Sequence, residues 1–177
     1  MICFNDIDSV NISFPTVVAI GKFDGMHLGH QKLMNEVVRI KNEHAGNYKT
    51  VAFMITHDSD DELLSTQERF KRLESLGIDY VVNCKFTDEV RTMSAEDFLT
   101  KILIEKLGAK YIVAGPDVRF GYMGAGDEKF IRSAEKDFDF KLVIIDKKCY
   151  KGSEISSTRI KKCILDGDND DAKAMLG

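Results

Sequence analysis

Short apolar runs alternate with longer amphipathic segments along most of the chain. The apolar runs have the length and the β-branched content of buried strands; they lie at residues 16–21 (TVVAIG), 49–56 (KTVAFMIT), 78–84 (IDYVVNC), 109–115 (AKYIVAG) and 140–146 (FKLVIID). The segments between and after them have the spacing of helices; they lie at residues 29–46, 66–77, 95–108, 128–138, 156–167 and 169–176. Strands that alternate with helices predict an α/β fold with a parallel sheet covered by helices on both faces.

The boundaries of two helices are marked by capping residues. Ser65 with Glu68 has the spacing of a capping box, and Gly77 is a typical helix stop. Ser94 with Asp97 is a second start signal of the same kind. These signals support the alternation of strands and helices.

The 177 residues are close to the usual size of one domain. We therefore expect residues 1–177 to form a single domain with a Rossmann-like, doubly wound parallel sheet. Ligands of such sheets bind at the carboxyl ends of the strands. Three segments are expected at that edge: residues 21–30, 56–65 and 115–126.

Composition narrows the classes of function. The net charge of −4 argues against general nucleic-acid binding, which depends on clustered Lys and Arg. The four cysteines are scattered without zinc-site spacing, which indicates reduced thiols. The first ten residues do not resemble a secretory signal, and no apolar run approaches the roughly 20 residues of a membrane span. We expect a soluble, cytoplasmic protein without nucleic-acid or membrane partners.

The segment GKFDGMHLGHQKL, residues 21–33, follows the first predicted strand and contains three glycines and two of the four histidines. Glycine at positions 21, 25 and 29 leaves the backbone open to a bulky ligand. The helix is expected to begin near Gly29, and a helix N-terminus favours phosphate. His27 and His30 would lie beside that phosphate as hydrogen-bond donors.

The residues alone leave the role of the two histidines open. A histidine is often structural or simply exposed, and a glycine-rich turn between a strand and a helix is a weak signal. A zinc site could also use two histidines, but no further ligands follow at a recognisable spacing. The sequence therefore leaves the metal ligands unknown.

Three motifs in the chain resemble one family. Residues 21–30 resemble the HxGH signature of nucleotidylyltransferases, in the GxFDGxHxGH form of bacterial FAD synthetases. The segment ISSTRI, residues 155–160, is similar to the carboxyl-side ISSTxIR segment of the same superfamily. Between them, residues 115–127 (GPDVRFGYMGAGD) are similar to the flavin loop of FAD synthetases. The resemblance extends over about residues 16–177.

This resemblance implies an enzyme that transfers AMP from ATP to FMN, giving FAD and pyrophosphate with the assistance of Mg²⁺. It assigns contacts with the ATP phosphates to His27 and His30, and binding of the leaving pyrophosphate to Arg159. It also places further residues in the nucleotide site: Gly21, Phe23, Asp24, Gly25, Gly29, Ser156, Ser157 and Thr158.

Several of these assignments have structural alternatives. Ser156, Ser157 and Thr158 would offer hydroxyl and N–H groups to phosphate, or they form an ordinary helix cap. Asp24 either binds the nucleotide or fixes the turn. For Phe23 the alternative is a packing role.

The flavin side of the predicted site departs from the family. The resemblance assigns flavin binding to His57, Asp117 and Phe120, and the alternative for Phe120 is an anchor that ties a surface turn to the core. The family's F-x-P-H-P turn is replaced by residues 54–58 (MITHD), in which only the histidine remains. Without the prolines the turn loses two fixed φ angles. The adjacent acidic residues, if they pointed inward, would repel an FMN phosphate.

Four functions remain open at this point. The first is an FMN adenylyltransferase without a riboflavin kinase domain, naturally separate or cut from a longer chain, with a separate riboflavin kinase as a partner that would supply FMN. The second is a nucleotidylyltransferase for a different phosphorylated acceptor. The third is a non-catalytic flavin- or nucleotide-binding protein, and the fourth is a protein-interaction module.

Overall fold

The computed structural model describes residues 1–56 and 62–177. Six parallel strands form the central sheet, in the order β1-β4-β3-β2-β5-β6. The strands are β1 (Ile2–Phe4), β2 (Thr16–Gly21), β3 (Lys49–Thr56), β4 (Tyr80–Lys85), β5 (Ala109–Ala114) and β6 (Lys141–Ile144). The predicted parallel α/β sheet is confirmed.

The order of the strands places a topological switch point beside β2. From β2 the chain continues through β3 to β4 on one side, and it then crosses back to β5 and β6 on the other. The loops that leave β2 and β5 therefore diverge at the carboxyl edge of the sheet. In open α/β sheets, ligands bind at such a switch point.

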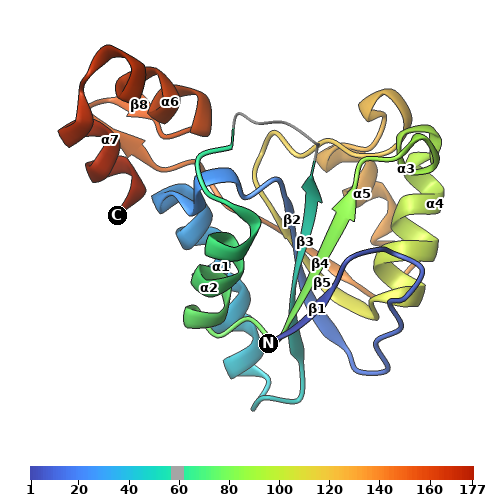
Figure 1. Ribbon diagram of the computed structural model, residues 1–177. Coiled ribbons are helices and arrows are strands. Elements are labelled where there is room, and N and C mark those ends of the chain that lie inside the picture. The colour runs from blue at the N-terminus through green and yellow to red at the C-terminus, as the bar shows by residue number, and fades with distance from the viewer. Residues whose placement is uncertain (57–61) are drawn as a thin grey trace.

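Helices cover both faces of the sheet (Figure 1). They are α1 (Leu28–Glu43), α2 (Thr66–Ser75), α3 (Asp88–Thr92), α4 (Ala95–Asp97), α5 (Glu128–Ala134), α6 (Ser157–Asp166) and α7 (Asn169–Leu176), with the short η1 (Asp24–Met26) and η3 (Tyr122–Gly124) and the longer η2 (Phe98–Lys106). Side chains alternate along β2, so that Val17 and Ala19 pack with α1 and α2 while Val18 and Ile20 pack with η2 and α5. Both faces are thus buried.

The helix predicted over residues 95–108 is present, but most of it is a π-helix rather than an α-helix. After the single turn of α4, residues Phe98–Lys106 form a π-helix, and the N–H of Leu107 donates to the carbonyl of Ile102, five residues back. Its apolar face is buried against the sheet all the same.

Strand β1, helix α3 and a hairpin were not predicted. Strand β1 is short and largely exposed at the sheet edge, so it carries no clear pattern. Helix α3 has only five residues. The predicted loop before α6 contains an antiparallel hairpin of β7 (Cys149–Tyr150) and β8 (Ser153–Glu154), where Lys151 and Gly152 both have positive φ, as a type I′ turn requires.

We call residues 149–177 the C-terminal lobe. Its small core consists of Ile155, Ile160, Ala172 and Met175. This core contacts Leu28 at the start of α1, and the Gln31 side-chain amide donates to the carbonyl of Leu176 at 2.9 Å. The lobe therefore lies beside the start of α1, near the carboxyl ends of the strands (Figure 1). No helix within the described residues is long and apolar enough to cross a membrane.

Candidate functional site

The loop between β2 and α1 is tightly wound. Phe23 and Met26 have φ angles of 50° and 43°, and Gly25 between them has a φ of 77°. Positive φ in non-glycine residues costs free energy and is common at ligand sites. Phe23 is 1% exposed and its ring lies edge-on to the ring of His30, with centroids 5.4 Å apart. Its ring therefore packs against His30.

The glycines of this loop make room for neighbouring side chains. A Cβ at Gly21 would lie 2.7 Å from the Phe23 ring, and one at Gly25 would lie 2.7 Å from Cδ1 of Leu63. At Gly29 the nearest group is His27, at 3.1 Å. The packing of the loop itself therefore requires glycine at the first two positions. The sequence analysis had explained these glycines differently, by the approach of a ligand to the backbone.

His27 and His30 stack face to face at the start of α1. Their ring centroids are 3.7 Å apart and the planes differ by 18°. His27 is the N-cap residue, and its Nδ1 accepts from the N–H of His30 at 3.4 Å. A neutral His27 therefore carries its proton on Nε2. The Nδ1 atom of His30 is buried and has no hydrogen-bond partner within the described part of the chain.

Burial keeps both histidines neutral. It lowers the pKa of His27 to about 4, against a smaller opposite effect of Asp24, and it lowers the pKa of His30 to about 3, with a further contribution from His27. At neutral pH the pair consists of uncharged imidazoles, which donate hydrogen bonds without adding a formal charge. The unpaired N–H groups of the α1 start supply the positive potential for an anion.

Asp24 is fully engaged by protein groups. Its Oδ1 accepts from the N–H of Leu63 at 2.8 Å, and its Oδ2 lies 3.1 Å from Nζ of Lys161. Its backbone carbonyl accepts from Oγ of Ser157 at 2.8 Å. Of the two alternatives for Asp24, these contacts support the one in which it fixes the turn.

The start of α6 carries the second motif. Oγ of Ser156 caps the helix by accepting from the N–H of Arg159 at 3.2 Å, so the ordinary cap is present. Ser156 and Thr158 are exposed, which leaves their side chains accessible to a ligand. Ser157 joins this helix to the first motif through its contact with Asp24.

Arg159 lies against the hairpin of the C-terminal lobe. Its Nη1 donates to three backbone carbonyls, those of Tyr150, Ser153 and Glu154, at 2.8 to 3.2 Å. The guanidinium also lies over the Tyr150 ring, 5.8 Å from the centroid. A contact of Arg159 with pyrophosphate would therefore use its other N–H groups.

The loop after β5 is tied to the same lobe. Nζ of Lys147 lies 3.0 Å from Oδ2 of Asp117 and 3.0 Å from Oε2 of Glu154. Both carboxylates are largely exposed, so they remain accessible and the pairs contribute little stability.

Phe120 does not lie beside these groups. It is 4% exposed and packs against Phe98 and Phe130, with ring centroids 5.2 and 6.1 Å apart. These contacts support the alternative in which it anchors the turn to the core. His57, the third predicted flavin ligand, lies outside the described residues.

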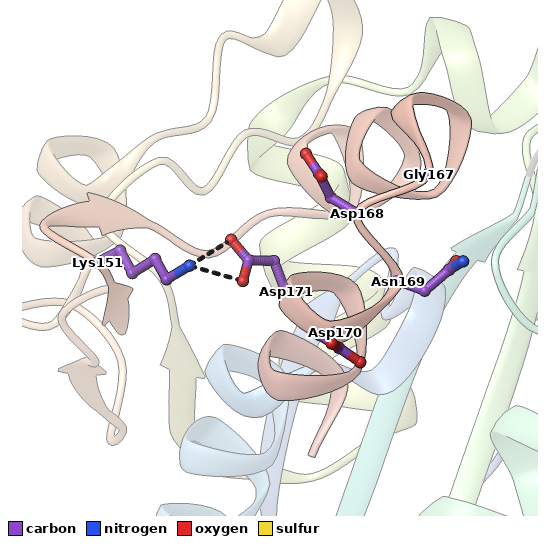
Figure 2. A pocket seen from close by; sticks show the side chains of 6 residues that line it. All are labelled: Lys151, Gly167, Asp168, Asn169, Asp170 and Asp171. Carbon is purple, nitrogen blue, oxygen red and sulfur yellow. Dashed lines mark hydrogen bonds and ion pairs between the residues drawn. The ribbon is translucent and has the colours of Figure 1, made fainter.

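A separate pocket lies on the C-terminal lobe, between α6, α7 and the hairpin (Figure 2). It is lined by Lys151, Gly167, Asp168, Asn169, Asp170 and Asp171. Figure 2 shows Lys151 paired with Asp171, at 2.8 Å. Three carboxylates around one paired lysine repel phosphate, so this pocket does not fit a nucleotide.

Sequence reasoning missed Lys161 and Lys147. For Lys161 a signal was present, because residues four apart lie on the same face of a helix. Ser157 belongs to the recognised motif, and Lys161 one turn later falls on the basic last position of the ISSTxIR pattern. Lys147 follows strand β6 in a segment with no recognisable pattern, and only the fold brings it to Asp117.

The sheet order, the glycine-containing turn at the switch point and the paired histidines at a helix start are features typical of α/β proteins that bind nucleotides. The chain belongs to the FAD synthetase family, whose model matches residues 10–159. The three motifs lie within or at the boundary of the matched range. The family resemblance of the sequence is confirmed.

Similar proteins carry two activities in their names. The chain is 35% identical over 176 residues to the bifunctional riboflavin kinase/FMN adenylyltransferase of Buchnera aphidicola subsp. Schizaphis graminum, covering 94% of this chain and 56% of that protein. It is 28% identical over 171 residues to the protein of the same description from Escherichia coli K12, covering 91% and 54%. The chain thus spans about half the length of these relatives.

A solved structure has the same fold. It is described as a macrolide-efflux protein from Streptococcus pneumoniae, and it matches with a TM-score of 0.86 and 25% sequence identity. The match covers 99% of this chain and 59% of that one.

Proposed function

We propose that this chain transfers AMP from ATP to FMN, giving FAD and pyrophosphate. The observation that carries the proposal is the stacked pair of His27 and His30 at the start of α1, at the switch point of the sheet. Membership of the FAD synthetase family and the names of the relatives support FMN as the acceptor.

In this reaction an oxygen of the FMN phosphate forms a bond to the α-phosphorus of ATP, and the bond from that phosphorus to the bridging oxygen breaks. Pyrophosphate leaves with the electron pair. The protein has to align the two phosphates and stabilise the charge on the oxygens of the transferring group. His27 and His30 would do so as neutral donors, together with N–H groups at the start of α1.

The start of α6 would hold the other side of the phosphate chain. Ser156 and Thr158 expose hydroxyl groups there, and Ser157 holds the helix start against Asp24. Arg159 would contact the leaving pyrophosphate through the N–H groups that the hairpin does not use. The backbone at Gly21, Phe23, Gly25 and Gly29 would border the nucleotide.

Mg²⁺ would enter with ATP. Within the described residues, no group of three or more His, Cys, Asp or Glu side chains is placed to hold a metal ion. Mg²⁺ commonly binds through substrate phosphates and water with only one or two carboxylates, so a preformed protein cage is not needed. When bound, it would neutralise phosphate charge.

The acceptor side of the proposal rests on Asp117, Phe120 and His57. Asp117 would offer a polar group to the flavin ring, while the buried Phe120 would act by holding the loop in place. The same proposal includes a cytoplasmic location, because the reaction consumes ATP. It also includes a riboflavin kinase that makes FMN, either as a separate protein or within a longer form of this chain.

An adenylyl-transfer assay tests the function. The chain is incubated with ATP, Mg²⁺ and either FMN or riboflavin, and FAD and pyrophosphate are measured. We expect FAD from FMN only, because riboflavin lacks the attacking phosphate. ATP binding without FAD formation would contradict the proposal. That result would favour the second candidate, a nucleotidylyltransferase for a different phosphorylated acceptor. The loss of the family prolines at residues 54–58 is the observation behind this candidate.

A further inference from the structure

Lys147 lies where the chain leaves the sheet for the C-terminal lobe. Just before it, the N–H of Ile145 donates to the carbonyl of Ala114 at 2.9 Å, which extends the pairing of β6 with β5 beyond the strands. Nζ of Lys32 in α1 donates to the carbonyl of Asp146 at 2.9 Å. The backbone that carries Lys147 is therefore held from two sides, close to the loop that follows β5.

The side chain of Lys147 lies between two carboxylates. Its Nζ is 3.0 Å from Oδ2 of Asp117, in the loop after β5, and 3.0 Å from Oε2 of Glu154, in β8 of the hairpin. Bonding to Asp117, and next to Glu154, raises the pKa of Lys147, so its charge is retained at neutral pH. Without this ammonium group the two carboxylates would face each other and repel.

Asp117 keeps one carboxylate oxygen available for a ligand. Lys147 takes Oδ2, and no group within residues 1–56 and 62–177 donates to Oδ1. A Cβ at Gly115 would lie 3.0 Å from Oδ1, so this oxygen lies over bare backbone. The side chain of Asp117 is 69% exposed. Its Oδ1 can therefore accept a hydrogen bond from a donor outside the protein.

We propose that Lys147 is a positioning residue for the acceptor: it separates the charges of Asp117 and Glu154, and so holds Oδ1 of Asp117 where it accepts from an N–H group at the edge of the acceptor ring. The proposal rests on the proposed function, in which the acceptor is FMN. The flavin ring carries such an N–H group at N3. Hydrogen bonds to an ionised acceptor are the strong ones, so this contact can select the ring.

Lys147 is not suited to bind the acceptor phosphate itself. Two carboxylates surround its single ammonium group, so the local charge is negative and repels phosphate. Its effect on the acceptor therefore passes through Asp117.

Flavin binding in the absence of ATP tests the proposal. Fluorescence titrations compare riboflavin with 3-methylriboflavin, in which a methyl group replaces the N3 proton, for the wild type and Lys147→Met. We expect the wild type to bind riboflavin about tenfold more tightly than the methylated analogue, because the analogue lacks the donor for a charged acceptor. In Lys147→Met the affinity for riboflavin should fall about fivefold, and the preference over the analogue should shrink to about twofold.

Three further variants provide the controls. The double variant Lys147→Met/Glu154→Gln removes the repelling carboxylate together with the lysine, so it should regain most of the affinity for riboflavin. Lys147→Arg keeps the positive charge and should bind nearly as the wild type does. Lys148→Met makes the same change at the next residue, which is also exposed, and should leave flavin binding unchanged.

Three results would overturn the proposal. The first is an unchanged preference for riboflavin over the analogue in Lys147→Met. The second is a double variant that binds as weakly as Lys147→Met, which would mean that the lysine contacts the ring directly. The third is a loss of affinity for FMN but not for riboflavin, which would mean that Lys147 binds the phosphate.

The same titrations distinguish this proposal from the proposed function. If the wild type binds flavin but makes no FAD, the proposed function fails, while the preference for riboflavin over its analogue still decides the role of Lys147. If the wild type binds neither riboflavin nor FMN, both proposals fail.

Discussion

Helix α1 carries stacked histidines at both of its ends, and the surroundings of the two stacks differ. At the start, His27 stacks on His30, and Nδ1 of His30 is buried without a partner among the described residues. At the end, His44 stacks on Tyr48 with centroids 4.3 Å apart, and its Nε2 lies 3.2 Å from the hydroxyl of Tyr111. Stacking alone therefore does not mark a site. The two stacks differ in that the His44 nitrogen has a hydrogen-bond partner, whereas the His30 nitrogen has none among the described residues.

The helix itself adds to the difference. Its start presents N–H groups and a partial positive charge, while its end presents carbonyl groups and a partial negative charge. The start lies at the carboxyl edge of the sheet, and the end lies at the opposite edge, before β3. Only a ligand at the start of α1 would lie both at a helix terminus that favours anions and at the switch point of the sheet.

The largest expected effect follows from replacing the histidines at the start. His27→Ala and His30→Ala should each lower kcat for FAD formation about 100- to 1,000-fold, as the loss of a donor to a developing charge does. The affinity for ATP should fall much less, because the donors act mainly in the transition state. Steady-state kinetics and ATP titration calorimetry measure the two quantities.

His44→Ala is the matched control on the same helix. It removes a stacked, partly buried ring but no proposed donor, so it should lower the stability while kcat stays within about threefold of the wild type. A loss of kcat equal to that of His30→Ala would show that the two ends act alike, and the assignment of the site to the start would be wrong.

The difference between the two ends could be predicted from the sequence only in part. The motif around His27 and His30 and its position after a buried strand indicated a phosphate site, because helix starts and strand ends follow from local patterns. The fold class followed from the alternation of strands and helices. By contrast, the partners of His44 come from residues 48 and 111, and no local pattern brings Tyr111 to α1.

The same limit explains what was missed at the site. The sequence could not decide whether Asp24 binds the nucleotide or fixes the turn, because its partners Leu63, Ser157 and Lys161 reach it only through tertiary contacts. For Phe120 both a flavin contact and an anchor to the core were open, and its packing against Phe98 and Phe130 supports the anchor. Local sequence predicts which backbone groups face a ligand, whereas the side chains that hold them in place are set by distant segments.

Two glycines allow the stability of the two ends of α1 to be compared. Gly25, before α1, and Gly46, after it, have φ angles of 77° and 75°, but a Cβ would be 2.7 Å from Leu63 at the first and meet nothing within 4 Å at the second. Gly46→Ala should cost about 1 kcal/mol from backbone strain alone. Gly25→Ala should cost about 2 to 4 kcal/mol because Leu63 must also move. Urea unfolding measures both, and equal costs would show that the start is not tightly packed.

The last expected effect concerns pH. The native pKa values of His27 and His30, about 4 and about 3, lie below the ordinary value of 6.5, so the unfolded chain binds protons first as the pH falls. Their contribution to stability is complete above pH 6.5 and is lost as the pH falls toward the native values. Between pH 7 and pH 5 we expect each histidine to lower the free energy of unfolding by about 1 to 2 kcal/mol. A His27→Asn/His30→Asn variant should lose this part of the pH dependence, whereas a pH dependence unchanged from the wild type would mean that the pair is not buried in its neutral form.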